Sequence, residues 1–354
     1  MKSSETSTMS IGEAYEITKP SIKLLEHLSH EKNQPFVYNT DVLKAYISSN
    51  TLNELLLAKD YIGYNYNAYV KFRNRVIRPT KTYKGFQSKY HTFIKLIQAL
   101  ELAKIDGLDD KNFIHSFYDI CFAPGAFTEG LLRLYDCSGF GITLIHEGLL
   151  IDETIASNPK FKVISPEDGD LYKYENLELA ISEAKDGVDL ACADGGFGVS
   201  DENLQSLYVY KLIFCEFVHA ICTLAKGGIF VCKLFDTFDE RTVQAIAALS
   251  MYFEKTYITK PTESRIVNSE RYIVCIGFNP DGLDALTERL KEILRTMTDD
   301  GMSMIFDEIT STAFKKNIRD INEDIAKKQT IAIRDTVYKC IELASKSRRS
   351  YHRK

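Results

Sequence analysis

Three charged residues of this sequence stand inside or beside apolar runs, at positions where they could do chemistry together. Lys233 lies inside VCKLF, and burying an amine there is costly unless the protein uses it. Asp194 ends the run VDLACAD, where it could also be a simple turn residue, and Glu270 stands shortly before YIVCIGF. If the first two runs are parallel strands and the last is antiparallel, all three residues reach one sheet edge. An amine and two carboxylates would then meet at a site suited to proton transfer.

A second candidate is the segment DICFAPGAFTE, from Asp119 to Glu129. It reads as the end of a strand, a Pro-Gly turn and the beginning of a helix. Open α/β sheets bind nucleotides at such a turn, and small residues let the backbone approach the ligand. The segment contains neither a G-x-G-x-x-G fingerprint nor a phosphate-binding loop, so an ordinary tight turn is an equally good interpretation of these residues alone.

The rest of the chain predicts the elements that would position these residues. Helical patterns are clearest over 88–105, 203–225 and 239–253, and residues 1–80 and those from 281 onward read as helical and amphipathic. Short apolar runs between them read as strands: 117–123, 140–145, 161–165, 188–194, 228–235, 256–260 and 272–278. Continuous apolar strands separated by helices predict a mainly parallel sheet covered on both faces. No helix-length segment separates the last two strands, so the last one is expected to be antiparallel.

Composition limits the classes of protein that this chain can belong to. The formal net charge of -5 argues against coating nucleic acid by bulk electrostatics, so any such contact needs local basic patches. We find no apolar run of membrane-spanning length and no hydrophobic leader in MKSSETSTMS. The eight cysteines show neither a C-x-x-C pair nor a metal-ligand spacing. We therefore expect an intracellular protein with reduced thiols, no membrane contact and no metal.

Several motifs resemble one family. The segment 119–129 resembles motif I of the FtsJ-like RNA 2′-O-ribose methyltransferases, although Ala126 stands where that family usually has a second glycine. The resemblance continues through GFGITL, EDGDLYK and VDLACADGGF, and it spans roughly residues 70 to 280. It is closest from 186 to 278, where ENLQ, GGIFVCKLFDTF, KPTESR and NSERYIVCIGF are similar to the eukaryotic and viral mRNA cap 1 2′-O-ribose methyltransferases.

This resemblance implies an α/β fold with a Rossmann-like class I methyltransferase sheet, mostly parallel with the last strand antiparallel, over residues 81–280. Residues 1–80 would form a helical N-terminal extension with a basic and aromatic segment that contacts RNA or the cap. Residues 281–354 would form a helical C-terminal extension with a basic tail.

The resemblance also implies a reaction and its catalytic residues. The methyl group of S-adenosyl-L-methionine would pass to the ribose 2′-hydroxyl of the first transcribed nucleotide of capped mRNA, without a metal. The family's K-D-K-E tetrad corresponds to Lys95, Asp194, Lys233 and Glu270, although Lys89 is a rival for the first position. Lys233 would be the general base, Lys95 and Asp194 would orient the hydroxyl, and Glu270 would tune Lys233. We expect burial and neighbouring cations to depress the pKa of Lys233.

Two further groups of residues follow from the resemblance. Asp170 would bind the adenine of the cofactor, unless it is only a turn residue. The cofactor-binding candidates are Asp119, Cys121, Ala123, Pro124, Gly125, Ala126, Phe127, Thr143, Asp168, Asp170 and Asp194. The candidates for RNA or cap binding, which could equally form a solvated basic face, are Arg73, Arg75, Lys84, Asn203, Ser264 and Arg265.

Alternatives to cap 1 methylation stay open at this point. One is 2′-O-methylation of another RNA position, such as cap 2, tRNA or rRNA. The other is a catalytically weak subunit that only binds RNA or the cap. The expected partners are the capped 5′ end of mRNA and other capping or transcription proteins, in the nucleus or, for a viral protein, in the cytoplasm.

Overall fold

The computed structural model describes residues 12–77, 82–83, 85–87, 91–145 and 151–351. Within them, eight strands form one sheet in the order β1-β10-β11-β9-β8-β5-β6-β7. Their bounds are β1 Glu13–Glu16, β5 Ser116–Ile120, β6 Ser138–Ile142, β7 Phe161–Val163, β8 Val188–Ala193, β9 Leu224–Leu234, β10 Phe253–Lys260 and β11 Arg271–Phe278. Strands β9, β8, β5, β6 and β7 are parallel, and β11 is antiparallel to β9. The predicted fold class is therefore confirmed.

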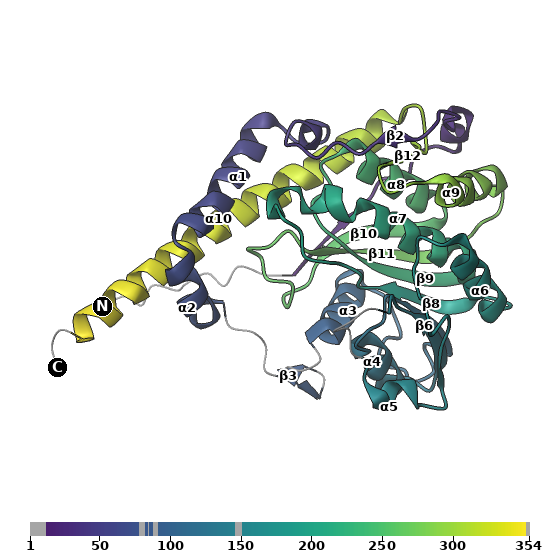
Figure 1. Ribbon diagram of the computed structural model, residues 1–354, viewed down its shortest axis with the longest axis horizontal. Helices are drawn as coiled ribbons and strands as arrows, with labels where there is room; N and C mark the ends of the chain where they lie inside the picture. The colour runs from purple at the N-terminus through teal and green to yellow at the C-terminus, as the bar shows by residue number, and fades with distance from the viewer. Residues whose placement is uncertain (1–11, 78–81, 84, 88–90, 146–150, 352–354) are drawn as a thin grey trace.

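Helices cover both faces of this sheet, as continuous apolar strands require. One layer contains α3 (His91–Leu102), α4 (Ala126–Leu134) and the short α5 (Glu153–Ala156), and Figure 1 shows it below the sheet. The opposite layer contains α6 Tyr174–Ala184, α7 Gln205–Thr223, α8 Glu240–Met251 and α9 Asp284–Thr296. Each layer has its own cluster of buried apolar side chains against the strands.

Helix α7, with the short helix η4 (Glu202–Leu204) that leads into it, corrects one expectation. The stretch Glu202–Thr223 is long and apolar enough to cross a membrane by length and composition, although we expected no such run. Its apolar window is 78% buried inside the fold, where α7 packs against β9 and α8. The hydrophobicity of this helix is thus explained by its place in the core.

Three helices form an arm outside the sheet domain. Helices α1 (Ser49–Tyr64) and α2 (Tyr66–Val76) pack against the long C-terminal helix α10 (Thr312–Tyr351), which extends well beyond the sheet in Figure 1. A third apolar cluster fills this junction, with Leu55 and Ile333 fully buried. The minor elements are η1 Ile22–His27, η2 Val42–Lys44, β2 Gln34–Pro35 with β12 Gly301–Met302, and β3 Thr82–Tyr83 with β4 Phe86–Gln87.

The N-terminal extension is not purely helical, because β1 joins the sheet. It pairs antiparallel with β10 and covers the edge of the sheet. Its four residues, EAYE, alternate between partly buried and exposed. So short a run in a polar region is not distinguishable from an irregular segment by its sequence pattern.

Candidate active site

The carboxyl edge of the sheet brings the three charged residues together. Asp194 directly follows β8, Lys233 is the penultimate residue of β9, and Glu270 directly precedes β11. Because β11 runs antiparallel to β9, with Tyr272 opposite Lys233, the beginning of β11 lies beside the end of β9. The strand order therefore brings all three residues to one edge of the sheet, as the sequence predicts.

Lys95 reaches the same place from helix α3. Its Nζ lies 2.7 Å from Oε1 and 2.9 Å from Oε2 of Glu270, so both carboxylate oxygens contact one ammonium group. Ser264 adds a hydrogen bond from its Oγ to Glu270 Oε1 at 2.7 Å. Ser264, a predicted RNA contact, is fully buried and supports Glu270. Lys89, the rival of Lys95, lies outside the described residues.

Lys233 is held differently. Its Nζ donates a hydrogen bond to the backbone oxygen of Asp194 at 2.7 Å and lies 3.4 Å from Oδ1 of that residue. The same Oδ1 accepts a hydrogen bond from the hydroxyl of Tyr272 at 2.6 Å. A Cβ atom at Gly196 would stand only 3.2 Å from Lys233 Nζ. A glycine so soon after Asp194 thus leaves room for the ammonium group.

The pKa values of Lys233, Asp194 and Glu270 are shifted by their surroundings. Burial alone lowers the pKa of Lys233, but the negative charges of Asp194, Glu270 and Glu216 outweigh it and raise that pKa above the usual value. Burial has the opposite effect on the carboxyl group of Asp194 and raises its pKa. For Glu270, burial is outweighed by Lys95, by the Ser264 hydrogen bond and by Lys233, which hold its pKa below the usual range.

The expectation of a depressed lysine pKa is therefore wrong for the unliganded protein. It assumed that cations would surround Lys233, whereas the charges that act on it belong to carboxylates. Lys233 is consequently protonated at neutral pH before any ligand binds.

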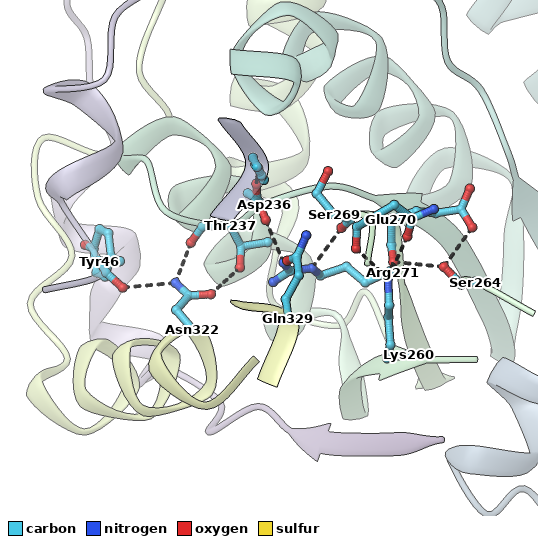
Figure 2. A network of polar contacts seen from close by, with 12 residues as sticks. Tyr46, Asp236, Thr237, Lys260, Ser264, Ser269, Glu270, Arg271, Asn322 and Gln329 are labelled. Carbon is cyan, nitrogen blue, oxygen red and sulfur yellow. Dashed lines mark hydrogen bonds and ion pairs between the residues drawn. The ribbon is translucent and has the colours of Figure 1, made fainter. Parts of the chain in front are cut away.

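A polar network ties this edge to the helical arm (Figure 2). Arg271, at the beginning of β11, is buried and donates to Asp236 Oδ1 at 2.7 Å. Asn322 of α10 donates from Nδ2 to the backbone oxygens of Tyr46 and Thr237 at 3.0 and 2.6 Å. Helix α10 is thereby fixed to the segment that follows β9, next to the candidate site.

The predicted cofactor turn lies between β5 and α4. Gly125 has a φ of 118°, a conformation that favours glycine, and α4 begins at the next residue. Ala126 is that first helical residue, where an alanine fits without strain. The departure from the family's second glycine therefore has no steric consequence for the backbone.

Asp119 stabilises this turn from inside. Its Oδ2 accepts hydrogen bonds from the backbone nitrogen and the hydroxyl of Thr128, at 3.0 and 2.7 Å. It is fully buried, and burial raises its pKa to about 7. Phe127 is also buried, whereas Cys121, Ala123 and Pro124 are partly or fully exposed along the turn. Asp119 thus holds the helix beginning, and the neighbouring residues present the turn.

The loop after β7 meets the end of β6. A Cβ atom at Gly169 would lie 1.8 Å from the backbone oxygen of Thr143, so only glycine permits this approach. Asp168 is paired with Lys173 at 2.7 Å, and Oδ1 of Asp170 accepts from the nitrogen of Tyr172 at 2.9 Å. Asp170 therefore has the geometry of a turn residue, which neither requires nor prevents contact with an adenine. Among the described residues, no group of three or more His, Cys, Asp or Glu could hold a metal ion.

A cleft of about 1040 Å³ opens over Lys233 and Glu270. Helices α1 and α2 form one wall, the loop after Asp194 forms another, and α10 contributes Gln329. The predicted contacts Arg73, Asn203 and Arg265 line it. Arg75 does not belong to that lining; its guanidinium lies over the ring of Phe72, 5.3 Å from the centroid. Lys84 lies outside the described residues.

Three exposed aromatic residues in this cleft were not singled out from the sequence. Tyr64, Tyr66 and Phe197 line it and are 85%, 61% and 46% exposed. The segment around Tyr64 contains many aromatic residues, and its pattern does not reveal which of them face solvent. Phe197 directly follows the Asp-Gly-Gly turn. Its position beside a predicted catalytic residue is the feature of the sequence that could have identified it.

The fold and the site together define a class of protein: an α/β enzyme with a nucleotide-binding type of turn and acid–base groups at the same sheet edge. More specifically, the model of the FtsJ-like methyltransferase family matches residues 92–278. Since this is more than half of the chain, the chain belongs to that family. The match includes the turn and the four residues predicted to form the tetrad, and it leaves out α1, α2 and α10.

Similar proteins have names that mention the mRNA cap. The Caenorhabditis briggsae cap-specific mRNA (nucleoside-2′-O-)-methyltransferase 1A is 32% identical over 291 residues, which cover 73% of this chain and 33% of that protein. The Trypanosoma brucei brucei cap-specific mRNA (nucleoside-2′-O-)-methyltransferase 1 is 37% identical over 219 residues, 59% of this chain and 56% of that protein. An inactive C. briggsae relative, 1B, is 32% identical over 249 residues, 64% of this chain and 29% of that protein. The chain thus spans about a third of the nematode relatives.

Proposed function

We propose that this protein transfers the methyl group of S-adenosyl-L-methionine to the ribose 2′-hydroxyl of the first transcribed nucleotide of capped mRNA. The observation that carries the proposal is the pair of charged residues in the lining of the cleft, Lys233 and Glu270, each with a partner of opposite charge behind it. Lys95 contacts Glu270 at 2.7 Å, and Asp194 lies 3.4 Å from Lys233. Similarity to named cap enzymes supports the substrate class. It does not by itself establish activity, since one of the relatives is named inactive.

The residues at the sheet edge fit a nucleoside cofactor. The turn at Gly125 and the approach of Gly169 to Thr143 bring the backbone close together at the carboxyl ends of β5 and β6, and Asp168 and Asp170 place carboxylates beside it. When bound, S-adenosyl-L-methionine supplies an already activated methyl group, so the protein's task is to position and deprotonate the acceptor.

Lys233 is suited to take the proton of the 2′-hydroxyl at its Nζ. It lies on the floor of the cleft, and the backbone oxygen of Asp194 fixes its direction. To act as a base it must first lose the proton that the neighbouring carboxylates stabilise. The paired Lys95 and Glu270 lie beside it and can orient the hydroxyl by hydrogen bonding.

The walls of the cleft are suited to the end of an RNA chain. Exposed aromatic rings stack on bases, and guanidinium groups bind phosphates. Tyr64, Tyr66 and Phe197 offer the rings, and Arg73 and Arg265 offer the cations. Local contacts of this kind are what a chain of negative net charge needs in order to bind RNA.

The test is a methyl-transfer assay with labelled S-adenosyl-L-methionine and RNAs of one sequence that are capped, uncapped or already cap 1. We expect transfer to the capped RNA, much less to the uncapped RNA, and none to the first nucleotide of the cap 1 RNA. Equal labelling of capped and uncapped RNA would favour another RNA position as the target. Cap binding without transfer would identify a binding subunit.

A further inference from the structure

A buried carboxylate in the core helix α7 acts on Lys233 by its charge, but its contacts have not been described so far. Glu216 is 0% exposed and lies in a helix whose other inward side chains are mostly apolar. Burying a carboxylate is costly unless partners satisfy it. The groups that satisfy this carboxylate therefore indicate its role, and they lie at the ends of β8 and β9.

Glu216 bridges the two strands next to the catalytic candidates. Its Oε1 accepts a hydrogen bond from the backbone nitrogen of Gly195 at 3.0 Å, and its Oε2 accepts from Cys232 Sγ at 3.3 Å. Gly195 directly follows Asp194, and Cys232 directly precedes Lys233. A Cβ atom at Gly195 would lie 2.1 Å from Glu216 Oε1, so the first glycine of the Asp-Gly-Gly turn makes this contact possible.

The charge of Glu216 also acts on Lys233. The titratable groups that face it are Asp194, Lys233, Cys232, Cys121 and Tyr172, among which Lys233 is the cation. Burial raises the pKa of Glu216 to about 7, whereas Cys232 and Lys233 act in the opposite direction. The negative charge of Glu216 in turn contributes to the raised pKa of Lys233.

We propose that Glu216 is a positioning residue for methyl transfer: from beneath the sheet edge it fixes the spacing of Asp194 and Lys233, and it places a negative charge next to Lys233. The inference rests on the proposed role of Lys233 as the base. It assigns a function to a residue that touches neither substrate nor cofactor, and it explains why a carboxylate is placed in the core helix.

Glu216→Gln tests the charge separately from the geometry. The amide oxygen can still accept from Gly195, but the negative charge is lost. The pKa of Lys233 should then fall, so the acid limb of the kcat profile should move to lower pH by about one unit and keep its slope. Asp239→Asn is the matched control. Asp239 is equally buried and caps α8 through Thr242, a role that asparagine also fills. Its profile should superimpose on the wild-type profile.

A second measurement does not depend on activity. In the protein with carbon-13-labelled glutamate side chains, Glu216 should titrate near its expected pKa of about 7. Lys233→Met removes the positive charge, so this midpoint should rise by about one unit. An unchanged midpoint, or a Glu216→Gln profile identical to the wild type, overturns the inference. If the wild-type protein transfers no methyl group, the proposed function fails, and the titration still decides the coupling between Glu216 and Lys233.

Discussion

The two lysines of the site differ in how they are held. Lys95 contacts both oxygens of Glu270, at 2.7 and 2.9 Å, so its charge is matched by one carboxylate. Lys233 donates to a backbone oxygen, and its nearest Asp194 side-chain oxygen is 3.4 Å away and already accepts from Tyr272. The two contacts to one carboxylate fix the direction of the Lys95 ammonium group, whereas Lys233 lies in the lining of the cleft, where an acceptor hydroxyl can reach it. We therefore expect Lys233 to take the proton and Lys95 to orient the hydroxyl, as proposed above.

The largest expected effect comes from removing the base. Lys233→Ala and Lys233→Arg should each lower kcat by roughly 10²–10⁴-fold, because neither side chain accepts a proton at neutral pH. Binding of S-adenosyl-L-methionine, measured by calorimetry, should be retained. Lys226→Ala is the control, since Lys226 lies at the other end of β9 and pairs with the exposed Asp281. Substantial turnover by Lys233→Arg would remove Lys233 from this role.

The pH dependence of the wild-type protein should show the same base. A protonated amine cannot accept the hydroxyl proton, and carboxylates raise the pKa of Lys233. We expect kcat to rise about tenfold per pH unit on the acid side, with no second limb from Glu270, whose pKa is held below its usual range. Rates at saturating substrate from about pH 6 to about pH 10 measure this. A rate independent of pH over that range would argue against an amine base.

Lys95 should tolerate a change that Lys233 does not. Lys95→Ala leaves the half-buried Glu270 without its bidentate partner and should lower kcat by roughly 10–100-fold. Lys95→Arg keeps the charge and can still bind both oxygens, so it should retain most of the activity. The two arginine variants, assayed side by side, sharpen the comparison. If Lys95→Arg is as inactive as Lys233→Arg, the roles of the two lysines are not distinct.

The hydroxyl of Tyr272 and the ammonium group of Lys233 face the same oxygen, Oδ1 of Asp194, at 2.6 and 3.4 Å. Tyr272→Phe removes the hydroxyl that donates to Asp194 Oδ1 at 2.6 Å. The freed oxygen should then pair with Lys233, raise the pKa of that lysine further and move the acid limb to higher pH. We expect kcat at neutral pH to fall roughly tenfold, which corresponds to about 1.4 kcal/mol. An acid limb that stays in place would show that Tyr272 only fills space.

The sequence placed some of these residues and not others, for physical reasons. Lys233 could be predicted because an amine inside the apolar strand VCKLF is unusual. Asp194 and Glu270 could be predicted because the expected strand directions bring them to the same edge of the sheet as Lys233. The raised pKa of Lys233 was not predictable, because it depends on which charges surround the amine in three dimensions. Glu216 was missed because one carboxylate in an amphipathic helix pattern reads as a solvated residue.

The wall of the cleft offers the smallest test, again between two like residues. Arg73 and Arg75 lie on the same turn region of α2, but only Arg73 belongs to the cleft lining, whereas Arg75 lies over Phe72. If phosphates of the RNA enter this cleft, Arg73→Ala should weaken RNA binding a few-fold and flatten its salt dependence by about one unit of slope. Arg75→Ala should leave both unchanged, because its guanidinium is turned to an aromatic ring outside the cleft.

Titrations of capped RNA at several salt concentrations measure the two slopes. Equal losses in both variants would mean that RNA follows the outer surface of α2, and the role of the cleft would then be limited to the cap-proximal nucleotide over Lys233.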